Sequence, residues 1–378
     1  MKKNVYANYL NDLVNEKSEI CISIIMPTHS LSPDRRTNQP QLERNIKEVK
    51  TYLYNNYSIE AVSALIEDID DLYKQIDFTH ITTGLGLFIS KNVKRLVHFF
   101  FPVKERFVVD RLFDIRDLLY ESYYNRPYTV LTLCQKEARL FNARLNVLTE
   151  VIDGVFPKKN VAEYEYASPS RGSSYAGYNN VKEFEKDKSV TSEIRLKSFF
   201  RETDDLLGSY LTIDTPLIVT GDQKDLVWFK QVTTHEHNIA CNIPGNYMMN
   251  NEHELGILTW KAMKLFLNNT KDKLIGEFEE RKGTGSGISG VEIENIWKAV
   301  HESRGYKLLV EKDFTFTAYL PIDNEMELYR YKPKQPSHKI TNIINRLIEV
   351  MLQKNGDVII TDNEVLRPYM GMALITRY

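Results

Sequence analysis

The chain has 378 residues, a formal net charge of −2 at pH 7, 42% hydrophobic residues and 26% charged residues. This length exceeds what one hydrophobic core usually serves, so we expect two or three domains. The small net charge argues against a protein that binds nucleic acid over its whole surface, but it leaves local basic patches open. No run approaches the roughly 18 apolar residues that span a bilayer, and the N-terminus lacks the apolar core of a signal peptide. We therefore expect a cytoplasmic protein with no membrane partner.

Cysteine usage points to the same compartment. The three cysteines are far apart, and each lies in an apolar run: Cys21, Cys134 and Cys241. This pattern predicts small buried residues that stay reduced.

The first third of the chain predicts an α/β unit that ends near Asn125. Helical spacing of apolar residues marks 4–16, 41–54 and 59–76, whereas compact apolar runs predict strands over 20–26, 86–90, 96–100 and 107–109.

The middle third begins with a meander of three predicted strands, 128–134, 138–143 and 147–151. A polar, irregular stretch over about 155–188 follows, and a loop of that length is usually functional or disordered. The next helix carries an apolar stripe, after which we expect a strand over 216–220 and helices over 223–234 and 252–270. The stripe consists of Leu196, Phe199, Phe200, Leu206 and Leu207.

The last third opens with four glycines between 283 and 290, which predict a hinge or flexible loop. Helices are then expected over 291–302 and 340–353, with strands over 306–310, 314–319, 357–361 and 372–377. Domain boundaries are placed near 126 and 270.

No complete catalytic or metal-binding motif occurs in the sequence. His235 and His237 lack the spacing of a helical zinc site and are interpreted as surface histidines. The glycines after 283 lack the Lys-Ser/Thr of a phosphate loop. Asp222, directly after a predicted strand, is interpreted as a helix N-cap in preference to a ligand-binding residue. We expect no catalytic residue, no metal and no cofactor.

Basic residues gather in and after the long polar stretch, with tyrosines between the first of them. Arginine and lysine pair with phosphates, and tyrosine stacks on bases, so this segment is a candidate for RNA contact. Interleaved acidic residues leave a solvated, mobile loop as the alternative. The basic residues are Lys158, Lys159, Arg171, Lys182, Lys186, Lys188, Arg195, Lys197 and Arg201.

Several segments, in order along nearly the whole chain, resemble the bacterial branch of the archaeo-eukaryotic peptide-chain release factor superfamily, the relatives of the eukaryotic class 1 release factor and Pelota. They read CISIIMPTHSLSPDRRTNQPQLERNIKEV, RPYTVLTLCQKEARLFNARLNVLTEV, KSFFRETDDLL, PLIVTGDQ, IPGNY and GDVIITDNEVLRPYMGMALITRY.

The resemblance implies an α/β protein of three domains. These are an N-terminal α/β domain over 1–125, a ribonuclease-H-like middle domain over 126–270 with a long loop at 155–190, and a C-terminal domain over 271–378. The last would be an α/β/α module similar to kink-turn RNA-binding ribosomal proteins, which bind RNA or protein. The resemblance also implies a bacterial, ribosome-associated role in translation.

The long loop departs from the family pattern. Release factors of this superfamily carry Gly-Gly-Gln there, next to the ester that joins peptide to tRNA, whereas 171–180 reads RGSSYAGYNN. We therefore expect a factor that binds the ribosome or tRNA in termination, rescue or control, without peptidyl-tRNA hydrolysis by the family mechanism. The residues expected to contact RNA are Arg171, Gly172, Gly177, Lys182, Arg195, Lys197 and Arg201.

Two other functions stay open. A diverged peptidyl-tRNA hydrolase or nuclease would use the middle domain, and a nuclease of that fold needs clustered carboxylates; the sequence offers Glu137 and Asp222. Alternatively, the same fold would bind a protein partner in a stress or defence system.

Overall fold

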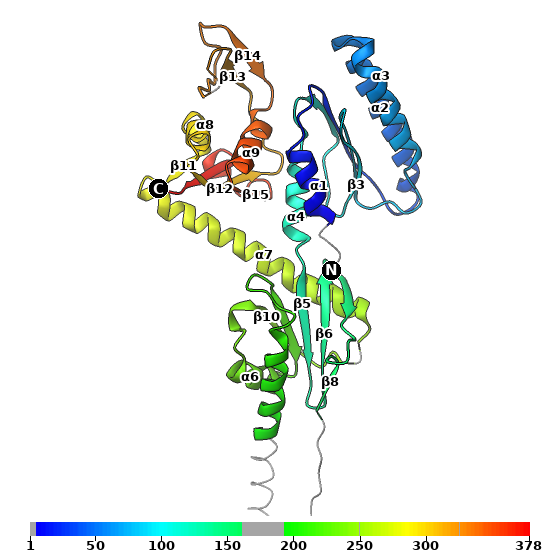
Figure 1. Ribbon diagram of the computed structural model, residues 1–378, viewed down its shortest axis with the longest axis vertical. Helices are drawn as coiled ribbons and strands as arrows, with labels where there is room; N and C mark the ends of the chain where they lie inside the picture. The colour runs from blue at the N-terminus through cyan, green and yellow to red at the C-terminus, as the bar shows by residue number, and fades with distance from the viewer. Residues whose placement is uncertain (1–4, 161–192, 249, 325) are drawn as a thin grey trace, which may run out of the picture. The chain divides into compact units, whose positions relative to one another are not determined.

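The computed structural model describes residues 5–160, 193–248, 250–324 and 326–378, with side chains from residue 10 onward. Contacts between residues divide the chain into two compact units (Figure 1). The middle unit is Tyr124–Thr270, and the split unit joins Met1–Tyr123 with Lys271–Tyr378. The predicted α/β class is confirmed, while the predicted three-domain boundaries stay a prediction. No helix of the described residues is long and apolar enough to cross a membrane.

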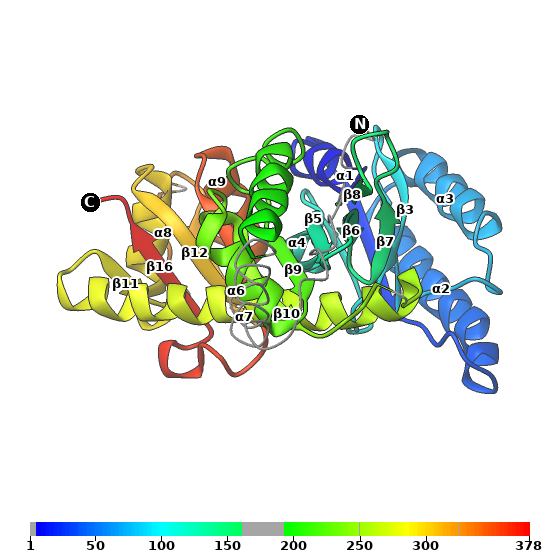
Figure 2. The same cartoon turned by 90° about the horizontal axis from the view of Figure 1, so that it is seen from below.

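The N-terminal part of the split unit is an antiparallel four-stranded sheet of order β3-β2-β1-β4. Even-numbered residues of β1, from Ile22 to Met26, pack on one face against apolar residues of two long helices, α2 and α3 (Figure 2). Cys21, Ser23 and Ile25 are buried as well, so β1 is covered on both faces, as its continuous apolar run predicts. The elements are α1 (Val5–Val14), β1 (Cys21–Pro27), α2 (Asn38–Asn56), α3 (Ile59–Lys74), β2 (Gly84–Ile89), β3 (Lys94–Phe99), β4 (Arg106–Asp110) and α4 (Arg116–Tyr124).

The middle unit contains a sheet of order β10-β9-β5-β6-β7, with the short strand β8 added to β6. Strands β5, β6 and β7 form an antiparallel meander. Strand β9 pairs parallel with β5, and β10 pairs parallel with β9. This is the strand topology of ribonuclease H, as expected. The strands are β5 (Tyr128–Leu133), β6 (Glu137–Arg144), β7 (Val147–Glu150), β8 (Lys158–Lys159), β9 (Leu217–Gly221) and β10 (Ile239–Pro244).

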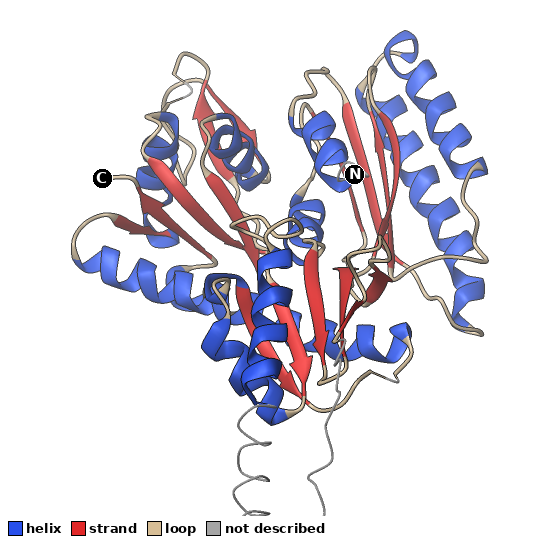
Figure 3. Ribbon diagram, turned by 60° about the horizontal axis from the view of Figure 1, so that its bottom comes forward, coloured by secondary structure: helices blue, strands red, loops and turns tan. Residues whose placement is uncertain are grey.

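Helices cover this sheet and correct two sequence predictions (Figure 3). Residues 193–207 are helical, and α6 (Gln223–Val232) follows β9. The helix predicted over 252–270 is α7 (Glu252–Gly283), which continues past 270 because no proline or turn signal interrupts the chain there. Strand β10 was not predicted, because its residues show no clear alternation.

The C-terminal part of the split unit is the expected α/β/α module. Its sheet has the order β11-β16-β12-β15. Phe278 of α7 packs on one face against Leu309 and Ile375, and α9 contacts β12 and β15. The elements are β11 (Gly287–Ser289), α8 (Ile293–His301), β12 (Gly305–Glu311), α9 (Ile343–Gln353), β15 (Asp357–Thr361) and β16 (Met372–Thr376).

The glycine-rich stretch after 283, predicted as a hinge or flexible loop, is irregular only over residues 284–286. Residues Gly287–Ser289 form β11, antiparallel to β16. A Cβ at Gly287 would lie 2.6 Å from the backbone nitrogen of Lys282, so this glycine permits a close approach of two backbone segments.

A separate hairpin, β13 (Ala318–Pro321) and β14 (Ser337–Ile340), follows β12. The strand predicted over 314–319 therefore begins later, at Ala318. The cysteine prediction holds only for Cys21, because Cys134 and Cys241 are partly exposed.

Candidate nucleic-acid interface

Hydrogen bonds hold the last described residues before the long polar segment, Lys158–Asn160, against β6 and the turn that precedes it. In the β8–β6 ladder, Lys159 lies opposite Glu137. The backbone N–H of Asn160 donates to the carbonyl of Lys136 at 2.8 Å, and its side-chain amide donates to the carbonyl of Gln135 at 2.8 Å. The segment therefore departs beside the turn between β5 and β6.

The chain returns to the described part of the middle unit in the helical residues 193–207. Leu196, Phe199, Phe200 and Leu207 are buried against the sheet, as the apolar stripe predicts, and Leu206 is partly buried against the same core. The helical period then places Arg195 and Arg201 on the exposed side, with Lys197 partly exposed.

Two lysines of this surface pair with acidic residues. Lys197 Nζ lies 2.8 Å from Glu193 Oε1, one helical turn away, and this hydrogen bond lowers the pKa of Glu193. Lys158 Nζ lies 3.2 Å from Glu202 Oε2. Lys136, Lys159, Arg195 and Arg201 are exposed, and the Lys158–Glu202 pair brings the helix that carries Arg201 next to β8. Sequence reasoning missed Lys136, because only the pairing of β8 with β6 reveals that it lies near the loop base.

The remaining predicted RNA contacts, Arg171, Gly172, Gly177 and Lys182, lie outside the described residues. The RNA-binding role of Arg195, Lys197 and Arg201 stays a prediction, which their exposed or partly exposed positions allow.

The two carboxylates considered for a nuclease lie at the end of the sheet where β5 and β9 finish and β6 begins. Glu137 begins β6 and Asp222 follows β9, on opposite sides of β5. Two strand spacings amount to about 10 Å. Asp225, in the first turn of α6, is buried with neither carboxylate oxygen hydrogen-bonded within the described structure. Burial, and then the nearby Asp222, raise the pKa of Asp225.

Of the two histidines considered for a metal site, His237 is exposed, as predicted, whereas His235 is partly buried in a polar cluster around Asp204. Buried Asp204 accepts hydrogen bonds from Thr233 Oγ1 (2.5 Å), the Thr234 N–H (2.7 Å) and Oγ1 (2.8 Å), and His235 Nδ1 lies 3.0 Å away. Burial acts to raise the pKa of Asp204, but these hydrogen bonds outweigh it and lower that pKa. Among the described residues, no group of three or more His, Cys, Asp or Glu is placed to hold a metal.

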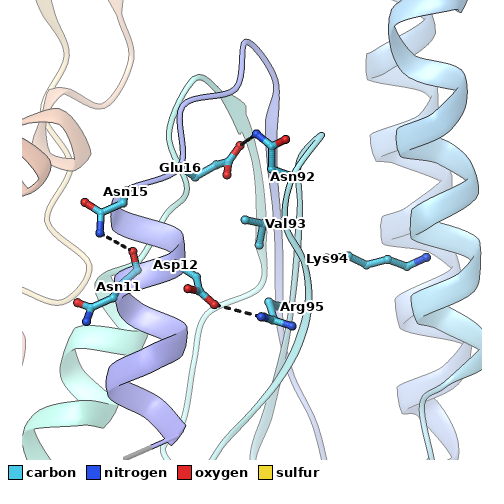
Figure 4. A pocket seen from close by; sticks show the side chains of 8 residues that line it. All are labelled: Asn11, Asp12, Asn15, Glu16, Asn92, Val93, Lys94 and Arg95. Carbon is cyan, nitrogen blue, oxygen red and sulfur yellow. Dashed lines mark hydrogen bonds and ion pairs between the residues drawn. The ribbon is translucent and has the colours of Figure 1, made fainter.

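The N-terminal part of the split unit contains an open pocket (Figure 4). It lies between α1 and the β2–β3 turn, where Arg95 pairs with Asp12 at 3.0 Å and Asn92 donates to Glu16 at 3.0 Å. Lys94 extends away from it toward α3. The pocket shares no residue with the predicted RNA-contacting set.

Comparisons with known proteins give one family. Residues 127–304 match the model of bacterial archaeo-eukaryotic release factor family 3. No curated protein matches the sequence.

Solved structures give distant likenesses. An archaeal translation termination factor, aRF1, is 13% identical, with a TM-score of 0.25, over 100% of this chain and 99% of that chain. Pelota from Archaeoglobus fulgidus is 15% identical, with a TM-score of 0.37, over 75% and 76%. Dom34 from S. cerevisiae, a translation termination-like factor, is 11% identical, with a TM-score of 0.37, over 78% and 74%. The family match, over a little under half of the chain, confirms the predicted resemblance to the bacterial branch of the archaeo-eukaryotic release factor superfamily for residues 127–304.

Proposed function

We propose that this protein is a cytoplasmic, bacterial, ribosome-associated factor that acts in translation termination, rescue or control without hydrolysing peptidyl-tRNA. One observation carries the proposal. The family match covers a ribonuclease-H-like unit whose long segment between β8 and residue 193 contains no Gly-Gly-Gln.

The residues at the loop base support an RNA partner. Exposed positive charge lies next to both ends of the long segment. Lys136 and Lys159 lie near its start, and Arg195 and Arg201 lie in the helix that follows it. Cations that neutralise phosphates release counterions, so binding through them weakens as salt increases. Arg171 and Lys182 would add charge within the segment, next to glycines 172 and 177. The partner would be a ribosome or a ribosome-bound tRNA.

Sedimentation with ribosomes tests the association. The wild-type protein should pellet with 70S particles or their subunits at low salt and dissociate as salt is raised. Reversing two charges in Arg195→Glu/Arg201→Glu should weaken binding about tenfold and reduce the slope of log K against log salt by about 1.5. Lys197 is left intact because reversing it would place two glutamates one turn apart.

A matched control distinguishes an effect of these two positions from an effect of the protein's net charge. Lys47→Glu/Lys91→Glu changes the net charge equally at exposed positions elsewhere and should bind ribosomes like the wild type. The ribosome proposal fails if the wild type shows no salt-sensitive co-sedimentation, and the interface is misplaced if both double variants weaken equally.

A release assay tests the absence of hydrolysis. Ribosomes that carry labelled peptidyl-tRNA should keep their peptide in the presence of the protein. Catalytic release would establish the diverged hydrolase instead. Degradation of structured RNA with magnesium would indicate the nuclease, whose carboxylates would include Asp222.

A further inference from the structure

The β13–β14 hairpin pairs with a third segment of the chain, at Tyr329. Beyond its pairing with β14, Tyr319 of β13 bridges to Tyr329 on its other edge. The Tyr319 N–H donates to the Tyr329 carbonyl at 2.8 Å, and the Tyr329 N–H donates to the Tyr319 carbonyl at 3.0 Å. The connection between the strands therefore folds back along β13 (Figure 1).

The pairing register aligns three side chains in one row. Tyr319 lies opposite Lys339 on one side and opposite Tyr329 on the other. Residues directly opposite in antiparallel pairs share a face of the sheet, so two tyrosine side chains and a lysine project from the same face. Ala318 and Leu320 face the other way and are 0% and 4% exposed. The row is therefore on the outer face.

Positive charge gathers next to this row, although the Tyr329 hydroxyl donates to Glu327 Oε2 at 2.7 Å. Residues 329–340 contain four cationic side chains and no acidic one. Arg330 pairs with Glu294 of α8 at 2.7 Å. Lys332, Lys334 and Lys339 are exposed, and no ion pair joins them to an acid of the described residues. Tyr331, between two of the cations, is 83% exposed.

We propose that this row, together with the exposed residues that follow Tyr329 in the chain, binds single-stranded RNA. We call these residues the hairpin surface (Tyr319, Tyr329, Tyr331, Lys332, Lys334 and Lys339). Bases would stack on the tyrosine rings, and the lysines would pair with the phosphates between them. Adjacent aromatic rings flanked by unpaired cations suit unstacked nucleotides, because every base presents an aromatic face and every linkage presents one negative charge. An acidic peptide would use the lysines but would leave the tyrosine row without a role.

This inference is independent of the ribosome proposal. The hairpin surface lies at 319–339, outside the family match at 127–304, and it shares no residue with the loop base. Its test uses free oligonucleotides, so either proposal can fail alone.

Fluorescence anisotropy with the full chain tests it, using labelled 12-nucleotide oligouridine and a 12-base-pair RNA duplex as probes. The wild type should bind the single strand more tightly than the duplex. Tyr319→Leu/Tyr329→Leu keeps apolar bulk but removes the stacking rings, and it should weaken single-strand binding about tenfold or more. Lys332→Glu/Lys334→Glu/Lys339→Glu should lower the salt slope by about 2.

Lys47→Glu/Lys91→Glu/Lys261→Glu is the matched control, because it reverses three exposed lysines outside the hairpin. It should bind oligouridine like the wild type, and thermal unfolding of every variant should match the wild type. Three results would overturn the proposal: no single-strand binding by the wild type, equal weakening in both lysine variants, or unchanged binding in the tyrosine variant. Displacement of RNA by polyglutamate together with that last result would identify an acidic protein partner.

Discussion

At the scale of single residues, the split unit contains a buried cluster of charged side chains from β4, from α4 and from the segment between them. Asp114 is fully buried, with Arg116 Nη2 at 2.9 Å and Arg106 Nε at 2.8 Å. Burial acts to raise the pKa of Asp114, but the two guanidinium groups hold it well below its usual range. Arg116 also donates to the carbonyl of Phe314 at 2.8 Å, which links α4 to the C-terminal part of this unit.

Replacing Arg116 with methionine should destabilise the protein by about 3 kcal/mol in urea unfolding near neutral pH. The change leaves a buried carboxylate with one cation and removes a donor from a carbonyl. Ionised Asp114 contributes stability above its unfolded pKa of 3.8, and this contribution is lost as pH falls through its lower folded pKa. The cost of the substitution should therefore shrink in acid.

The control for this prediction is Arg44→Met. Arg44 pairs with Glu105 at 3.2 Å on the surface, where the two side chains are 63% and 36% exposed. Its loss should cost less than about 1 kcal/mol. Equal costs for the two substitutions would contradict the assigned role of Arg116.

Glu121 should make stability depend on pH near neutrality. Burial raises the pKa of Glu121 to about 7 from 4.5, and Asp117 adds to the effect, although the backbone N–H of Phe100 donates to Oε2 at 3.2 Å. The folded state therefore binds this proton more tightly than the unfolded state, so stability falls as pH rises from about 4.5 to about 7.

The variant Glu121→Gln keeps the acceptor and removes the titration. Its free energy of unfolding should match that of the wild type near pH 4.5 and exceed it at pH 8 by up to about 3 kcal/mol. Denaturant unfolding at both pH values measures this difference. A constant difference at the two pH values would exclude a raised pKa.

At the scale of elements, Gly256 and Gly276 of α7 lie in different packing environments. A Cβ at Gly256 would lie 2.1 Å from the carbonyl oxygen of Asn146, in the turn between β6 and β7, whereas a Cβ at Gly276 would meet nothing within 4 Å. The first glycine therefore permits close packing of the helix on that turn, and the second contributes only backbone freedom.

Alanine at the two positions should have opposite effects on thermal unfolding. Gly256→Ala should destabilise the protein by about 1–3 kcal/mol, because the turn or the helix must move. Gly276→Ala should stabilise it by about 1 kcal/mol through helix propensity. Stabilisation by both substitutions would show that α7 does not pack on Asn146 as described.

Element prediction from sequence worked best where one face of an element is buried. The stripe in 193–207 and the continuous apolar run of β1 report burial directly, on one face of the helix and on both faces of the strand. Strands β10 and β11 were not predicted from the sequence. Their extended conformation comes from pairing with β9 and with β16.

At the scale of the whole molecule, the middle unit has its own sheet and hydrophobic core, which includes Leu131, Phe200, Val219 and Phe229. The split unit joins both ends of the chain through α4, where Tyr120 donates to Asp362 at 2.7 Å and Asp117 pairs with Lys312 at 3.2 Å.

A fragment of residues 124–270 should therefore fold alone. Because it keeps the complete sheet and core of the middle unit, it should unfold in one cooperative thermal transition when followed by circular dichroism. A fragment without such a transition would show that the middle unit depends on the rest of the chain and would count against the proposed middle domain.

The sequence by itself determined the order and kind of most elements, the family resemblance and the lack of Gly-Gly-Gln, because these depend on local periodicity and on residue identity. Only the tertiary structure decided which distant residues meet. It placed Lys136 beside the start of the long segment, and it aligned Tyr319 with Tyr329 and Lys339. Such neighbours depend on strand register across long sequence separations, and register leaves no signal in the local pattern of either strand when both are short and polar.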